Sequence, residues 1–278
     1  MRKRNLSALL ALLVPAAPLL VLLASCGPEG APESRRKARE HAGGAAKLLR
    51  EDVRRHYAAM EESAERLAAD MARADVTPQR LRRRLRSLRE APRGVQDLIV
   101  SPKSFVAAIG LDGKVIAKDA DTDEDSMAGL DLGAIAPCVQ GALAGRGAGH
   151  CIVEFANPTG RESSISLVFA HAVRHEGRLV GAVAAGIPLP ALARRLSRQL
   201  QLDVQSEQPP PIVWALMWHR DRIHTAATPP EIDQECPRPA QIRQALGRSA
   251  GGYTDEKLVQ SRWFGYAVLP VPSIGRDV

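Results

Sequence analysis

The sequence predicts an α+β fold in which a long N-terminal helix precedes one or two modules built on antiparallel sheets. Between residues 53 and 71, apolar residues are spaced alternately four and three apart, which is typical of one face of a helix. From about Asp97 the chain changes to short segments rich in β-branched residues and separated by turn sequences, the pattern of antiparallel strands. The order of two strands, a short helix and further strands then occurs a second time.

The helical region is expected over residues 35–96, after a Gly- and Pro-rich tether at 26–34. Thr77 and Pro78 form an N-cap and a first helical residue, so a second helix with a leucine face should begin there. The apolar stripe of the first helix packs either on its own domain or against a second copy as a dimer seam. Its members are Val53, Tyr57, Met60, Ala64, Leu67 and Met71.

The first sheet module is expected over residues 97–188. It should contain a hairpin with a turn at Leu111–Lys114, a short helix over Leu132–Leu143 and three later strands. The five expected strands are Phe105–Ile109, Val115–Lys118, His150–Phe155, Ser164–Arg174 and Leu179–Ile187. A connecting helix with a leucine face follows over residues 189–204.

The second module, residues 205–278, repeats this order in outline. We expect a hairpin, a short helix and two later strands. Their ranges are Ile212–Trp218, Ile223–Ala226, Ala240–Leu246, Val259–Phe264 and Tyr266–Val271. The sequence ends at Val278, about where a final strand would begin. The module is therefore either incomplete or completed by another segment.

The N-terminus carries the pattern of a secretory signal. Arg2, Lys3 and Arg4 precede an apolar run, Leu6–Ala24, which ends in small residues before Cys26. An uncleaved membrane anchor is the alternative, because the run is nearly long enough to span a bilayer. Pro15 and Pro18 interrupt such a helix and favour a cleaved signal peptide over residues 1–25.

The segment from Leu23 to Cys26 resembles the bacterial lipobox, whose cysteine receives diacylglycerol and becomes the new N-terminus. The resemblance implies a lipid-anchored, extracytoplasmic protein with Cys26 as the lipid acceptor. Gly27, where an aspartate would retain a lipoprotein in the inner membrane of a Gram-negative cell, favours the outer membrane.

The overall charge does not indicate a nucleic-acid partner. The 278 residues carry a formal charge of +7, but Arg2, Lys3 and Arg4 belong to the expected signal. Much of the remaining surplus lies on the amphipathic segment 80–89, where arginines supply the solvated face. An aromatic content of only 4% also speaks against a surface that stacks bases.

The sheet modules resemble the extracytoplasmic Cache sensor domains, which are relatives of PAS folds. The motifs that carry the resemblance are the first hairpin, Ile109–Ala117, the segments Gly129–Leu132 and Gln140–Gly145, and the closing hairpin, Ala172–Val183. The likeness covers residues 97–187 well and residues 212–278 in outline, as in a tandem (double) Cache region. It implies a domain that binds a small molecule outside the cell and reports through its long helix.

Members of that family usually continue into a membrane helix and an output domain, which this sequence lacks. A signal would therefore pass to a separate partner protein. The resemblance places the ligand between the sheet and the segment from Asp131 to Phe155, with the strand Ser164–Arg174 alongside. The candidate ligand-binding residues are His171, Phe169, Phe155, His150 and Asp131. A histidine such as His171 in an apolar strand is more often structural, and the aromatic–arginine–aspartate set of amino-acid-binding members is not recognisable.

Two of the four cysteines, Cys138 and Cys151, are candidates for a disulfide, since the expected compartment permits one. Catalysis and cofactors find no support: there is no G-x-S-x-G elbow, H-E-x-x-H helix or Walker loop. The alternating aspartates from Asp119 to Asp125 lack the glycine and glutamate of a calcium loop, so no metal is expected. We therefore expect a sensor rather than an enzyme. The alternative is a structural or protein-interaction lipoprotein that keeps the Cache fold without a working ligand pocket.

Overall fold

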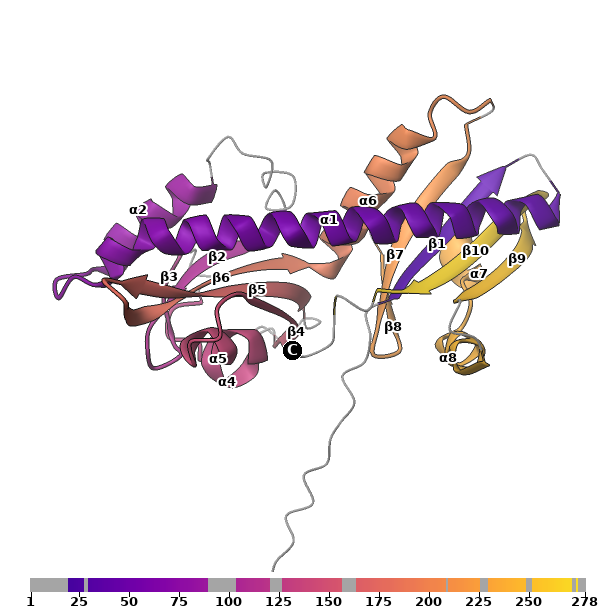
Figure 1. Ribbon diagram of the computed structural model, residues 1–278. Coiled ribbons are helices and arrows are strands. Elements are labelled where there is room, and N and C mark those ends of the chain that lie inside the picture. Colours follow the sequence, from indigo (N-terminus) through magenta and orange to yellow (C-terminus); the bar gives the residue numbers. More distant parts are fainter. Residues whose placement is uncertain are drawn as a thin grey trace, which may run out of the picture.

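Two five-stranded antiparallel sheets lie along one long helix in the computed structural model of the chain (Figure 1). The structure describes residues 20–27, 30–89, 104–120, 127–156, 164–208, 210–225, 230–248, 252–271 and 274. The predicted α+β class is confirmed. The N-terminal part of the apolar run, the region 90–103 and the acidic residues 121–126 lie outside the described residues.

Helix α1, Ala31–Met71, is 41 residues long and forms one wall of both modules. It begins within the expected tether, because Pro32 in the first turn leaves no helical hydrogen bond unmade. Its first half presents alanines to the second sheet, and its second half presents the predicted stripe to the first sheet. The alanines are Ala38, Ala42, Ala45 and Ala46, each no more than 4% exposed.

The stripe from Val53 to Met71 packs inside the chain. Five of its six members are buried, and Tyr57 is half-buried against the same cluster. This face of α1 is therefore not available as a dimer seam. Helix α2, Pro78–Arg89, begins as predicted, with the Arg80 amide donating to Thr77 Oγ1 over 3.3 Å.

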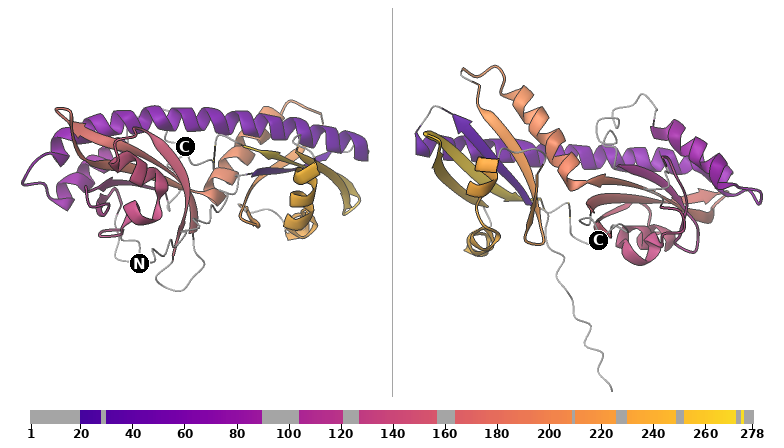
Figure 2. Two further views of the ribbon diagram at one scale, coloured as in Figure 1. Left: turned by 60° about the horizontal axis from the view of Figure 1, so that its bottom comes forward. Right: turned by 180° about the vertical axis from the view of Figure 1, so that it is seen from behind.

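The first sheet has the strand order β3-β2-β6-β5-β4. Its outer layer, away from α1, is made by α4 and α5 (Figure 2). The expected single helix is divided, because Pro137 begins a new helix after the extended residue Ala136. The bounds are β2 Phe105–Ile109, β3 Val115–Lys118, α4 Leu132–Ile135, α5 Pro137–Leu143, β4 Gly149–Phe155, β5 Ser164–His175 and β6 Arg178–Pro188.

The second sheet has the order β8-β7-β1-β10-β9, with α7 and α8 on the side away from α1. Helix α6, Leu189–Asp203, connects the two modules and buries its predicted leucine face. The remaining bounds are β1 Leu20–Gly27, β7 Ile212–His219, β8 Arg222–His224, α7 Pro230–Glu235, α8 Pro239–Arg248, β9 Tyr253–Val259 and β10 Arg262–Pro270.

The second sheet includes β1, which comes from the end of the expected signal sequence. This strand lies between β7 and β10 and is antiparallel to both. It takes the central place that β6 takes in the first sheet, although it precedes α1 in the chain. In the sequence, β1 lies more than 180 residues away from β7.

The last two strands differ from the prediction in their turn. The chain reverses at Gln260 and Ser261, both with positive φ, and not at Gly265. Gly265 lies inside β10, where a Cβ would overlap the carbonyl oxygen of Ser34 in α1. The glycine at 265 therefore allows α1 to pack closely against β10 and does not form a turn.

No helix in the part of the chain that the structure describes is long and apolar enough to cross a membrane.

Replacing Gly265 by alanine should destabilise the protein by about 2 kcal/mol, since the added methyl group forces α1 away from β10. Gly247 in α8 is the matched control, because a Cβ there meets no atom within 4 Å. Gly247→Ala should leave stability unchanged or raise it by ~0.5 kcal/mol. Urea unfolding of both variants measures the difference. Equal stability of the two would contradict the close contact.

Candidate functional site

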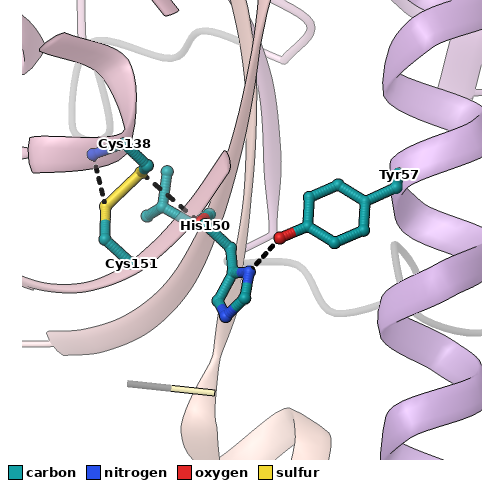
Figure 3. The surroundings of a disulfide bond; sticks show 5 residues. Tyr57, Cys138, His150 and Cys151 are labelled. Carbon is teal, nitrogen blue, oxygen red and sulfur yellow. Dashed lines mark hydrogen bonds between the residues drawn. A yellow bond between two sulfur atoms is a disulfide. The ribbon is translucent and has the colours of Figure 1, made fainter. Parts of the chain in front are cut away.

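The strands β4 and β5 present different chemistry to the two sides of the first sheet. On β5, Phe169 and Val173 point into the core under α1, whereas Val168 and Ala170 belong to the cluster under α4 and α5. The same alternation on β4 places His150 on the α1 side and Cys151 on the α5 side (Figure 3). Adjacent residues of one strand thus contact both helical layers.

Four rings from α1, β4 and β5 form an aromatic cluster on the α1 side, namely His56, Tyr57, His150 and Phe169. Phe169 is the centre: His56 stacks on it at 4.6 Å, and Tyr57 meets it edge-on at 5.9 Å. The Tyr57 hydroxyl and His150 Nδ1 share a hydrogen bond (Figure 3). Because burial raises the pKa of Tyr57, its phenol stays protonated at neutral pH.

His56 is held in this cluster as a neutral imidazole. Its Nδ1 donates to the carbonyl oxygen of Asp52, 2.9 Å away, and burial lowers its pKa. Its Nε2 is buried and has no hydrogen-bond partner among the described residues. Taking up a proton there would place a charge in an apolar core, so this ring resists protonation.

One turn away, Asp52 holds α6 against α1. The guanidinium of Arg195 donates to both carboxylate oxygens, over 2.9 and 2.8 Å. Asp52 is only 3% exposed, so the charge pair is shielded from water and its geometry is bidentate. The junction between the two modules is therefore fixed directly beside the aromatic cluster.

The other side of the sheet is apolar and is fastened by the disulfide. Cys138 in α5 is bonded to Cys151 in β4, with 5.5 Å between their Cα atoms. Phe155 lies edge-on against Phe105 at 5.7 Å. Side chains of α4, α5 and the sheet, including Leu132, continue this apolar cluster.

The structure divides the five predicted ligand residues between the two sides. His150, Phe169 and His171 lie on the α1 side, and Phe155 lies on the α5 side. Phe169 is 1% exposed beneath His56, and His171 Nδ1 lies 2.8 Å from the Ala172 carbonyl oxygen. Asp131 caps α4, where Oδ1 accepts from the Ala134 amide over 2.9 Å. The five residues therefore do not converge on one cavity.

Three residues of this region were missed in the sequence, namely Asp52, His56 and Arg195. Asp52 and His56 are four apart, beside the recognised stripe, so they share a helix face with it. That spacing was a usable signal for two polar groups on a buried face. No local pattern identifies Arg195, whose partner lies 143 residues away.

Of the remaining acidic and cysteine residues named in the sequence, those that the structure describes lie apart from the aromatic cluster. Asp119 is buried and accepts the Val106 amide with Oδ1 over 3.1 Å, which is a structural role. Asp121 to Asp125 lie outside the described residues. Among the described residues no cluster of three or more His, Cys, Asp or Glu side chains has the form of a metal site. The Cys236 side chain is buried.

Comparison with solved structures gives matches over most of the chain. The ligand-binding domain of the Campylobacter jejuni chemoreceptor Tlp3 in complex with L-valine matches with a TM-score of 0.51 and 11% identity, over 86% of this chain and 93% of that one. Its complex with L-norvaline matches equally well, over 86% and 91%. The chain has the fold of a chemoreceptor sensor domain.

The likeness extends to the fold alone. The amino acid chemoreceptor PctC of Pseudomonas aeruginosa PAO1, in complex with GABA, matches at 16% identity and a TM-score of 0.45, over 84% and 99% of the two chains. No family model and no curated protein matches the sequence. Residue roles in this sensor fold must therefore come from its own geometry.

The neutral state of His56 predicts that the protein loses stability in mild acid. The pKa of His56 in the folded chain lies below its unfolded value of 6.5. As the pH falls through 6.5, the unfolded chain therefore binds a proton at this ring more readily than the folded chain does. The free energy of unfolding should therefore fall as pH decreases from 7.5 to 5.5. His56→Phe keeps the stack on Phe169 but cannot titrate, and should lose less stability over this range.

Urea unfolding of both proteins at the two pH values measures the effect. Some acid sensitivity should persist in the variant, because burial also lowers the pKa of His41 and His224, and that of His219 to about 4. An identical pH dependence in the two proteins would show that His56 is not held neutral.

Proposed function

We propose that the protein is a lipid-anchored, extracytoplasmic sensor domain that binds a small molecule in its first module and acts through a separate signalling protein. The fold supports this proposal, since it is shared with ligand-binding domains over 86% of the chain. The Tlp3 and PctC domains were solved with amino acids bound. No catalytic step is part of the proposal.

The single observation that carries the proposal is the double contact of β4. His150 reaches Tyr57 in α1, and the next residue, Cys151, is covalently joined to α5. A ligand that displaces α5 would therefore move β4 and, through the Tyr57 hydrogen bond, act on α1. The ligand accordingly belongs on the α5 side, where Phe155 is the half-buried candidate. Phe169 and His171 belong to the readout on the α1 side.

Asp52 and Arg195 extend this readout to the second module. The ion pair joins α1 to the connecting helix α6. A shift of α1 beside His56 would therefore also move α6, which leads into the second sheet. In the proposed function, the first module detects and the second module presents the result to the partner. A homodimer through α1 would use its exposed face, since the apolar face is occupied by the two sheets.

The anchor at Cys26 is supported by the sequence alone. A basic start, an apolar run and small residues before the cysteine together meet the requirements of lipoprotein export. Outer-membrane placement follows from Gly27 if the cell is Gram-negative.

A structural lipoprotein is the second candidate, and one observation favours it. The space between the first sheet and the helices α4 and α5 is packed with buried apolar side chains. A sensor must open this layer to bind, whereas a structural protein would keep it closed.

A thermal-shift screen of the full chain against small metabolites, amino acids included, should give at least one compound with a saturable rise in Tm. Ligand at a hundred times its Kd adds about 2.7 kcal/mol of stability. Phe155→Ala should weaken binding at least tenfold. His171→Ala, on the opposite face of the sheet, is the matched control and should leave the Kd unchanged.

The reverse result, with His171→Ala weakening binding and Phe155→Ala not, would place the ligand under α1 and refute the proposed side. A library without any saturable stabiliser would favour the structural lipoprotein.

Metabolic labelling tests the anchor separately. Cells expressing the full chain should incorporate a fatty acid into the protein, and Cys26→Ala should abolish the label because it removes the acceptor thiol. Cys236→Ala is the control and should keep the label. Labelling that persists in Cys26→Ala would refute the anchor.

A further inference from the structure

The second sheet depends on a strand that export would remove. Cleavage before Cys26 takes away Leu20–Ser25, six of the eight residues of β1. Those residues lie opposite Trp218 to Val213 on β7 and opposite Pro270 to Gly265 on β10. The proposed lipidated form therefore lacks the central strand on which both neighbours pair.

The groups that would lose their partners can be assigned on β7. The amides of Val213 and Ala215 donate to Gln201 Oε1 and Ser197 Oγ of α6, over 3.0 and 2.8 Å. Backbone groups alternate in direction along a strand, so the amides of Trp214 and Leu216 point to β1. An unpaired buried amide or carbonyl costs about 1–3 kcal/mol, and the vacated position would contain several.

Neighbouring elements hold β7 and β10 apart. Strand β7 is bonded to α6 as described. Strand β10 is fixed to α1, because the absence of a side chain at Gly265 leaves room for the Ser34 carbonyl oxygen and the Ser34 hydroxyl donates to the Trp263 carbonyl. Direct pairing of β7 with β10 would have to break one of these attachments. These attachments oppose closure of the position between them when β1 is absent.

We propose that the position between β7 and β10 is a strand-binding site, which in the chain cut before Cys26 takes an extended apolar segment of the signalling partner as an antiparallel strand. This rests on the proposed anchor at Cys26 and names the place where the partner of the sensor docks. Main-chain hydrogen bonds to two strands at once would supply the affinity, and the flanking side chains would select the sequence.

The chemistry of the partner segment follows from the two faces of the position. On one face, Ala215 and Ala267 belong to the core under α1, and on the other, Leu216 and Tyr266 belong to the core under α7 and α8. The segment must therefore be apolar on both faces and about seven residues long. Opposite Gly265 the residue must be small, since α1 lies closest there; Ser25 of β1 stands at this register.

The test uses the full chain with a protease site placed between β1 and α1, purified in detergent. After cutting, β1 remains bound without a covalent link. A fluorescent peptide of the sequence Leu20–Gly27, with serine for Cys26 and terminal lysines, should then replace it saturably. The matched control peptide has proline for Leu23, which removes one hydrogen bond of the central strand, and should bind at least tenfold more weakly.

Amide exchange, read residue by residue by NMR, locates the binding. When the cut β1 is removed under mild denaturant and the denaturant is then diluted out, Trp214 and Leu216 should lose protection, and added peptide should restore it. Val213 and Ala215 are internal controls that should stay protected by α6. Equal binding of the proline peptide, no exchange at all, or lasting protection of Trp214 in the empty position would each overturn the strand site.

The proposed anchor is tested by a different measurement, the fatty-acid labelling of Cys26. Loss of the strand site with fatty-acid labelling of Cys26 intact would refute this inference and leave the anchor standing. If the peptide exchanges but fatty-acid labelling does not depend on Cys26, the anchor is refuted. The chain is then not cut before Cys26, and β1 stays in place as the central strand of the sheet.

Discussion

Close packing of one helix against two sheets is the constraint on which the structure depends. The first half of α1 can approach the second sheet because its inward residues are alanines, such as Ala38 and Ala42, and because β10 has a glycine at 265. Its second half carries larger residues, such as Met60 and Leu67, and stands over the first sheet. A single rigid element thus belongs to both modules, so neither core can rearrange without the other.

That constraint gives the first sheet its two different sides. The α1 side holds polar groups that are paired within the chain, among them Asp52 with Arg195 and Tyr57 with His150. The α5 side is apolar and is tied to β4 by the disulfide. In the proposed sensor, a polar side with directional hydrogen bonds suits the transmission of a shift from the sheet to α1. An apolar side under two short helices suits a site that must open, because non-directional contacts can be replaced by those of a ligand.

The sequence allowed most of the elements to be predicted, because their signals are local. Apolar spacing located α1 and α6, and the Asp112-Gly113 turn located the first hairpin. Alternation also put Phe169 and His171 on one face of β5. It could not say which layer covers that face, since a strand carries no information on what packs against it. For that reason the candidate ligand residues form one group in the prediction and lie on two sides of the sheet in the structure.

The errors lie where a distant contact overrides the local pattern. Gly265 has the pattern of a turn and lies inside a strand, because Ser34 approaches it from 231 residues away. The apolar run before Cys26 is the sharper case. A short apolar segment satisfies a secretion signal, and it equally satisfies a strand buried on both faces, since both need only consecutive apolar residues. Composition cannot separate these two uses. In this chain they exclude one another at Leu20–Ser25, so the fate of that segment decides whether the second sheet is closed by its own strand or open to another.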